Sequence, residues 1–161
     1  MKMRNPQQLK GLISNKAKAS GVPADTALHM YVMERFLERL ANSQYRGSLI
    51  LKGGYLLYSH WGLGNRTTSD LDLTHKSLEI NDEEASGIVE SICSVNVDDG
   101  FRMSLTRTRP IAEVLDHPGI RAYIMAEYGI REQFMSTSCR RRPSFRKRSY
   151  AGYSRCSATR R

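Results

Sequence analysis

The sequence predicts a mixed α/β (α+β) domain in which helices pack against a small mixed sheet. Apolar residues recur at helical spacing in the first forty or so residues, which is typical of amphipathic helices. Residues 49–51, 70–73, 101–108 and 121–127 instead carry short apolar runs or the alternation of strands. With 161 residues and 40% hydrophobic content, the chain can bury one core of ordinary size. We therefore expect a single folded domain.

Helix boundaries are indicated by the residues that start and stop helices. Asn5 before Pro6 is typical of a cap followed by the first helical residue, and the break at residues 21–23 precedes a longer predicted helix over residues 24–43. Asn81 precedes three acidic residues, which predicts a capped helix that ends near Ser94. A short helix is expected over residues 55–61.

Two glycines and two aspartates form the motif with the most chemical information. Gly53 and Gly54 directly follow the predicted strand at residues 49–51, where the backbone must turn tightly or approach a ligand. Asp70 and Asp72 are two residues apart, so on a strand their carboxylates share one face. Two such carboxylates repel each other unless a cation lies between them, and a divalent metal with a polyphosphate is one common solution.

This motif and its flanks resemble a known family. The run LKGG, a helix-length spacer and RTTSDLDL (residues 66–73) are similar to the AbiEii nucleotidyltransferase toxins, a branch of the polymerase beta-like nucleotidyltransferase superfamily. The flanking segments MERFLERL, SICSVNVDDG and HPGIRAYI are similar too, and the resemblance covers about residues 5–134. It implies a nucleotidyltransferase fold and a toxin of a toxin–antitoxin or abortive-infection system, with a cognate antitoxin protein as partner.

The resemblance also implies roles for seven residues. The reaction would be in-line attack on the α-phosphate of an NTP, which transfers an NMP to an acceptor such as RNA or tRNA. Asp70 and Asp72 would be catalytic and would bind Mg²⁺ (or Mn²⁺). The residues expected to bind the nucleotide are Gly53, Gly54, Ser69, Lys52 and Arg66.

Each of these roles has an alternative without catalytic function. The two glycines can form a simple turn, and Asp70 and Asp72 can be solvated residues on an exposed edge strand. Lys52 and Arg66 can be surface cations, and Ser69 can be a turn or capping hydroxyl. Three aromatic residues that follow the glycines, Tyr55, Tyr58 and Trp61, are expected to pack in the core.

The net charge of +9 is concentrated at the C-terminal end. Residues 1–134 hold equal numbers of basic and acidic residues, whereas residues 135–161 hold nine Lys or Arg and no acid. This segment is rich in serine and lacks a periodic apolar face, so we expect a domain boundary near Phe134 and a disordered basic tail. Two explanations of the tail remain open: a nucleic-acid-binding arm, or the product of a frame shift.

The departure from the family pattern also bears on function. The family implies a further strand with a third carboxylate after the strand at residues 121–127, and then a helical C-terminal region. No Asp or Glu follows Glu132, so both features are expected to be missing from a truncated or frame-shifted chain. Three functions remain open: an active nucleotidyltransferase, a catalytically inactive remnant, and a nucleic-acid-binding protein that acts through its tail.

The sequence predicts a cytoplasmic protein. No stretch reaches the roughly 18 consecutive apolar residues of a membrane span, and no secretory signal is recognised at the N-terminus. Cys93, Cys139 and Cys156 show neither a disulfide framework nor metal-ligand spacing, so we expect free thiols.

Overall fold

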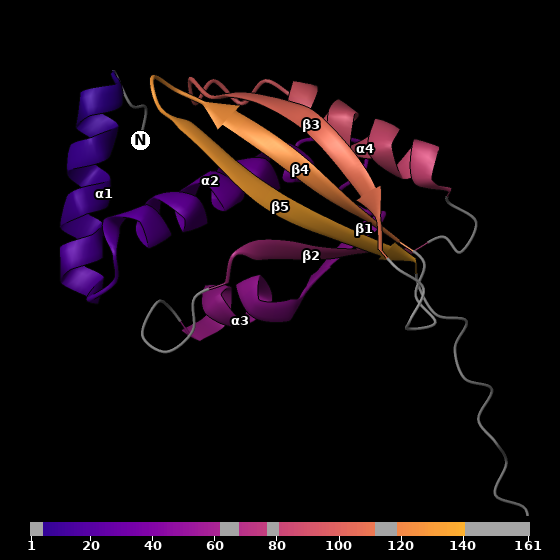
Figure 1. Cartoon of the computed structure of the whole chain (residues 1–161), viewed down its shortest axis with the longest axis horizontal. Helices are drawn as coiled ribbons and strands as arrows, with labels where there is room; N and C mark the ends of the chain where they lie inside the picture. The colour runs from indigo at the N-terminus through magenta and orange to yellow at the C-terminus, as the bar shows by residue number, and fades with distance from the viewer. Residues whose placement is uncertain (1–4, 62–67, 77–80, 112–118, 141–161) are drawn as a thin grey trace, which may run out of the picture.

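The fold is α+β, as predicted, and it combines four helices with a five-stranded mixed sheet in the part of the chain that is described (Figure 1). The computed structural model describes residues 5–61, 68–76, 81–111 and 119–140. The helices are α1 (Pro6–Ser20), α2 (Ala24–Ala41), α3 (Gly53–Trp61) and α4 (Asp82–Ser94). The strands are β1 (Leu49–Lys52), β2 (Asp70–His75), β3 (Arg102–Pro110), β4 (Gly119–Glu127) and β5 (Arg131–Arg140).

The predicted ends of α1 and the predicted start of α4 are confirmed by their capping residues. The Asn5 side chain accepts a hydrogen bond of 2.8 Å from the backbone N–H of Gln8, and Gly21, with a φ of 68°, follows the last residue of α1 in the left-handed conformation. Asn81 and Glu84 form a reciprocal capping box at the start of α4. Local sequence therefore determines where these helices begin.

The strands lie in the order β1-β2-β5-β4-β3. β2 pairs with β5 in parallel, and the other three pairs are antiparallel, which confirms the predicted mixed sheet. The aspartate-bearing strand β2 is flanked by β1 on one side and β5 on the other. Asp70 and Asp72 are thus not on an edge strand, and the edge-strand alternative is wrong.

β5 is a strand that the sequence did not predict. It begins at Arg131 and ends at Arg140, so it crosses the expected domain boundary at Phe134. Residues 135–140 belong to the predicted tail, yet they pair with β2. Residues 135–139 also pair with β4. The rest of the predicted tail, residues 141–161, lies outside the described residues.

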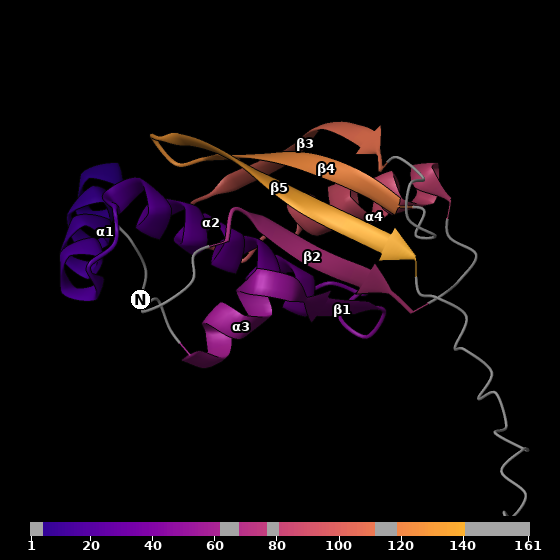
Figure 2. The same cartoon turned by 60° about the horizontal axis from the view of Figure 1, so that its bottom comes forward.

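One face of the sheet is buried against the helices, and the other is open. Leu71, Phe134, Ala122 and Ile124 are each at most 2% exposed, and the Phe36 ring of α2 packs edge-on against Phe134 with centroids 5.6 Å apart. Figure 2 shows α2 and α4 behind the sheet, with β5 and β4 facing the viewer. Because side chains alternate along a strand, the residues between these buried positions project from the open face.

A buried ion pair connects α2 to the turn before β3. Arg39 is only 2% exposed, and its guanidinium donates to both carboxylate oxygens of Asp99 at 2.6 and 2.8 Å. It also donates to the carbonyl oxygen of Phe101 at 2.8 Å. Such a bidentate pair fixes both the distance and the orientation of the two segments.

Candidate active site

Gly53 and Gly54 pack directly against the aspartate-bearing segment. Gly53 has a φ of 70°, and a Cβ built on it would lie 2.0 Å from Oδ2 of Asp72. A Cβ on Gly54 would lie 2.9 Å from both Cβ and Oγ1 of Thr68. Only glycine fits at these two positions without a shift of the neighbouring side chains. The glycines therefore bring the start of α3 against Asp72 and Thr68.

The two aspartates lie on the open face of β2. Asp70 and Asp72 are half-buried, and they alternate with Leu71 and Leu73, which are at most 1% exposed in the core. The Thr68 hydroxyl donates to Oδ1 of Asp70 at 3.0 Å. Burial and then the negative charge of Asp70 raise the pKa of Asp72, and Lys52 opposes them. A cation held between the carboxylates would relieve this repulsion, so the pair fits a divalent metal.

Lys52 lies beside Asp72 on the neighbouring strand. It is the cross-strand neighbour of Asp72 in the antiparallel pair of β1 and β2, and its side chain is exposed. The hydroxyl that contacts Asp70 belongs to Thr68, whereas the backbone carbonyl oxygen of Ser69 contacts the His29 ring. Arg66 lies outside the described residues.

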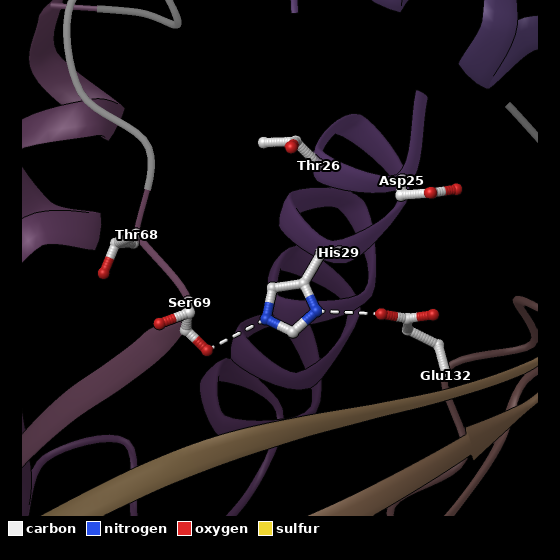
Figure 3. A pocket seen from close by; sticks show the side chains of 6 residues that line it. All are labelled: Asp25, Thr26, His29, Thr68, Ser69 and Glu132. Atoms are coloured by element: carbon white, nitrogen blue, oxygen red, sulfur yellow. Dashed lines mark hydrogen bonds and ion pairs between the residues drawn. The ribbon is translucent and has the colours of Figure 1, made fainter. Parts of the chain in front are cut away.

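Beside the start of β2 lies a pocket of about 400 Å³ that the sequence did not predict. Its lining comes from α2, from the segment before β2 and from β5, and comprises Asp25, Thr26, His29, Thr68, Ser69 and Glu132. Figure 3 shows the His29 ring, which projects from α2, between Ser69 and Glu132. Its Nδ1 is 2.9 Å from Oε1 of Glu132, and its Nε2 is 2.9 Å from the carbonyl oxygen of Ser69. His29 thus connects α2 to both β5 and the residue before Asp70.

The two contacts of His29 require an additional proton. A carbonyl oxygen and an ionised carboxylate only accept hydrogen bonds, and a neutral imidazole carries a single N–H. Both contacts are hydrogen bonds only when the ring is an imidazolium or when Glu132 is protonated. In the imidazolium form, His29 and Glu132 make an ion pair.

β5 occupies the place of the expected third carboxylate strand, but it has no carboxylate beside the aspartates. Its parallel register with β2 sets Met135 opposite Asp70 and Thr137 opposite Asp72. Glu132, the last acidic residue of the sequence, instead contacts His29. Across the described residues, no group of three or more His, Cys, Asp or Glu side chains is arranged to hold a metal ion.

Tyr55, Tyr58 and Cys93 agree with the sequence predictions. Tyr55 is 4% exposed and packs edge-on against Tyr58, which confirms core packing for this pair. Cys93 is a buried free thiol, as expected, and burial raises its pKa to about 12. The side chains of Trp61, Cys139 and Cys156 lie outside the part that is described.

The comparison with protein families agrees with this geometry. The family model described as "Nucleotidyl transferase AbiEii toxin, Type IV TA system" matches residues 35–153. The chain belongs to this family. The match begins in α2, spans the Gly-Gly and Asp-x-Asp motifs and continues through β5. A search of the curated proteins finds no match.

Membership in the AbiEii family establishes the broad class of the protein. The family consists of nucleotidyltransferase toxins of type IV toxin–antitoxin systems, and this implies an antitoxin partner. The described part of the chain contains no helix that is both long enough and apolar enough to span a membrane.

Sequence reasoning missed three residues of the site, namely Thr68, His29 and Glu132. Thr68 lies inside the recognised RTTSDLDL run, so its hydroxyl was a visible candidate two residues before Asp70. His29 and Glu132 are separated by 103 residues, and no local pattern connects them. Only the packing of α2 against the sheet brings them together.

Proposed function

We propose that this AbiEii-family chain transfers an NMP from an NTP to an RNA acceptor. The observation that carries the proposal is the contact of Gly53 and Gly54 with Asp72 and Thr68. This contact supports a single site that combines the glycine turn with the carboxylate pair. A polyphosphate at the glycines would then lie next to the carboxylates.

The chain's own groups have complementary roles toward the triphosphate. Backbone N–H groups at the start of α3 point out of the helix without intrahelical partners, and they can donate to phosphate oxygens. Lys52, beside Asp72, supplies positive charge against the triphosphate. The Ser69 hydroxyl and Arg66 are further candidates for nucleotide contacts.

Asp70 and Asp72 would hold Mg²⁺ or Mn²⁺ on the open face of β2. When bound, the metal neutralises the phosphate oxygens and stabilises the charge of the leaving group. In the reaction, a hydroxyl oxygen of the acceptor forms a bond to the α-phosphorus, and the bond from that phosphorus to the bridging oxygen breaks. Pyrophosphate leaves, and the hydroxyl proton passes to solvent. Thr68 keeps Asp70 oriented through its hydrogen bond.

Metal binding gives a prediction that does not depend on turnover. We expect Mg²⁺ at about ten times its Kd to raise the Tm of the wild type by about 3–6 °C, because binding to the folded state contributes about 1.4 kcal/mol. The Asp72→Asn variant, which keeps the shape of the side chain but loses its charge, should show a much smaller shift. The measurement is thermal unfolding with MgCl₂ against NaCl of equal ionic strength. Equal shifts in the two proteins would refute metal binding at Asp72.

A transfer assay tests the reaction. The folded chain is incubated with Mg²⁺, each α-³²P-labelled NTP in turn and total RNA, and we expect label in RNA with release of pyrophosphate. A chelator should stop the transfer, and γ-³²P-labelled NTP should leave the RNA unlabelled, because the γ-phosphate leaves with pyrophosphate. RNA labelled equally from both positions would contradict NMP transfer.

The residues on β5 favour a second candidate, binding of NTP without transfer. Met135 and Thr137 lie opposite the two aspartates, so neither position supplies a third carboxylate. An inactive member of the family would bind NTP and Mg²⁺ in an equilibrium assay yet leave RNA unlabelled. Binding and labelling measured on the same preparation separate the two candidates.

A further inference from the structure

Three arginines lie close together on the open face of the sheet, beyond the aspartates. Arg107 and Arg109 on β3 and Arg121 on β4 are all exposed. Arg109 and Arg121 lie directly opposite each other in the antiparallel register. Like charges at opposed positions destabilise a sheet, so this placement has a cost for folding alone.

A β-bulge places the β3 arginines on this face. The register of β3 against β4 shifts between Leu105 and Arg107. Leu105 pairs with the buried Ile124, whereas Arg107 pairs with Tyr123, whose neighbours along β4 are buried. In a regular strand, residues 105, 107 and 109 would share one face. The extra residue reverses the alternation and turns Arg107 and Arg109 away from the helices.

The three guanidinium groups are available to a polyanion. None of them forms an ion pair with another residue of the described chain. Arg107 stacks over the ring of Tyr123, with its Cζ 4.1 Å from the ring centroid. An arginine on an aromatic ring combines a cation for phosphate with a flat surface for a base.

The register connects this surface to the candidate active site. Arg121 lies opposite Thr137, and Thr137 lies opposite Asp72, so Arg121 is two strands away from the carboxylates. At roughly 4.8 Å per strand this is about 10 Å, on the side of Asp72 away from β1, the strand that leads into Gly53 and Gly54. The aspartates therefore lie between the glycines and the arginines, where an acceptor would have to enter.

We propose that Arg107, Arg109, Arg121 and Tyr123 form a binding surface for a single strand of the acceptor RNA. This rests on the proposed function for the identity of the bound molecule. The arginines hold consecutive phosphates, Tyr123 and Arg107 stack with a base, and the strand crosses the open face toward Asp70 and Asp72.

The test measures binding of a labelled single-stranded RNA of mixed sequence to the full chain, by fluorescence anisotropy over a range of salt concentrations. The sheet-face variant is Arg107→Gln, Arg109→Gln and Arg121→Gln. The matched control is Lys10→Gln, Lys16→Gln and Lys18→Gln, which removes three exposed positive charges from α1 in the helix layer. The nine basic residues of 135–161 are present in all proteins and cancel in the comparison.

For single strands the salt slope changes by about 0.7 for each phosphate neutralised, so we expect the sheet-face variant to lower its magnitude by about 2. The control should stay close to the wild type. An unchanged affinity and slope in the sheet-face variant, or an equal loss in the control, would overturn the proposal. Labelled polyglutamate serves as a second probe. If the sheet-face variant loses binding to polyglutamate but not to RNA, the surface binds an acidic protein, and the proposal is overturned as well.

Single variants and a separate transfer assay complete the test. The single variants Arg109→Gln and Arg121→Gln replace the triple variant if it does not fold, and each should lower the slope by about 0.7. The binding assay contains no NTP, so its result is independent of the transfer assay. If RNA binding depends on these arginines but the transfer assay shows no labelling, the binding surface is supported and the proposed reaction is contradicted. If the chain transfers NMP but the variants bind RNA as the wild type does, the proposed reaction is supported and the binding surface is contradicted.

Discussion

Replacement of Asp72 by alanine is expected to reduce nucleotidyl transfer at least about 1,000-fold. Asp72 faces the glycine turn, with Oδ2 only 2.0 Å from the position that a Cβ on Gly53 would occupy, so its carboxylate would lie next to a triphosphate held by the glycines. Loss of a metal ligand removes several kcal/mol of transition-state stabilisation, and about 4 kcal/mol corresponds to a factor of about 1,000. Initial rates of label transfer from α-³²P-NTP to RNA, at saturating Mg²⁺, measure the loss.

Two further variants separate charge from packing. Asp72→Asn preserves the shape beside Gly53 but not the negative charge, so it should lose nearly as much activity as Asp72→Ala. Asp82→Ala removes an exposed carboxylate from the first turn of α4, in the helix layer, and should transfer at the wild-type rate. Asp72→Ala activity within tenfold of the wild type would exclude Asp72 as a metal ligand in the reaction.

The sequence predicted those elements whose signals are local. Asn5, Gly21 and Asn81 determine helix ends through hydrogen bonds or backbone conformations within a few residues, and the structure has these ends where the sequence predicts them. β5 differs because its stability comes from its neighbours. Residues 131–140 carry few β-branched or alternating apolar residues, yet they lie between β2 and β4 and pair with both. Composition places six of the ten residues of this strand in a predicted tail, because pairing across a sheet is not visible in composition.

The residues of the candidate site also differ in whether a local sequence pattern predicts them. Gly53, Gly54, Asp70 and Asp72 follow from spacing, since a period of two sets both carboxylates on one face. The contact of the glycines with Asp72 and the position of Lys52 beside it are properties of the β1–β2 register. The meeting of His29 with Glu132 depends on how α2 packs against the end of β5, which no short-range pattern encodes.

Replacement of Asp99 by alanine is expected to lower the free energy of unfolding by about 3–5 kcal/mol. Arg39 is 2% exposed and would lose its carboxylate partner, so that among the described residues just the carbonyl oxygens of Arg35 and Phe101 would accept from its terminal nitrogens. An uncompensated charge in a buried position has a cost of this order. Chemical denaturation monitored by circular dichroism at neutral pH measures the difference. Glu90→Ala, which removes an exposed carboxylate of α4, is the matched control and should change the stability by less than about 0.5 kcal/mol.

The pH dependence of the same pair gives an independent check. Burial of Asp99 opposes its ionisation, but hydrogen bonds from Arg39 and from the Phe101 N–H outweigh burial and lower its pKa. Because the folded-state pKa lies below the unfolded value, the pair's contribution is complete above the ordinary carboxyl range and is lost as the pH falls through the lowered pKa. The gap in stability between wild type and Asp99→Ala should therefore be constant near neutral pH and narrow in acid. A gap that instead widens on acidification would mean that Asp99 does not stabilise the fold as an ionised partner of Arg39.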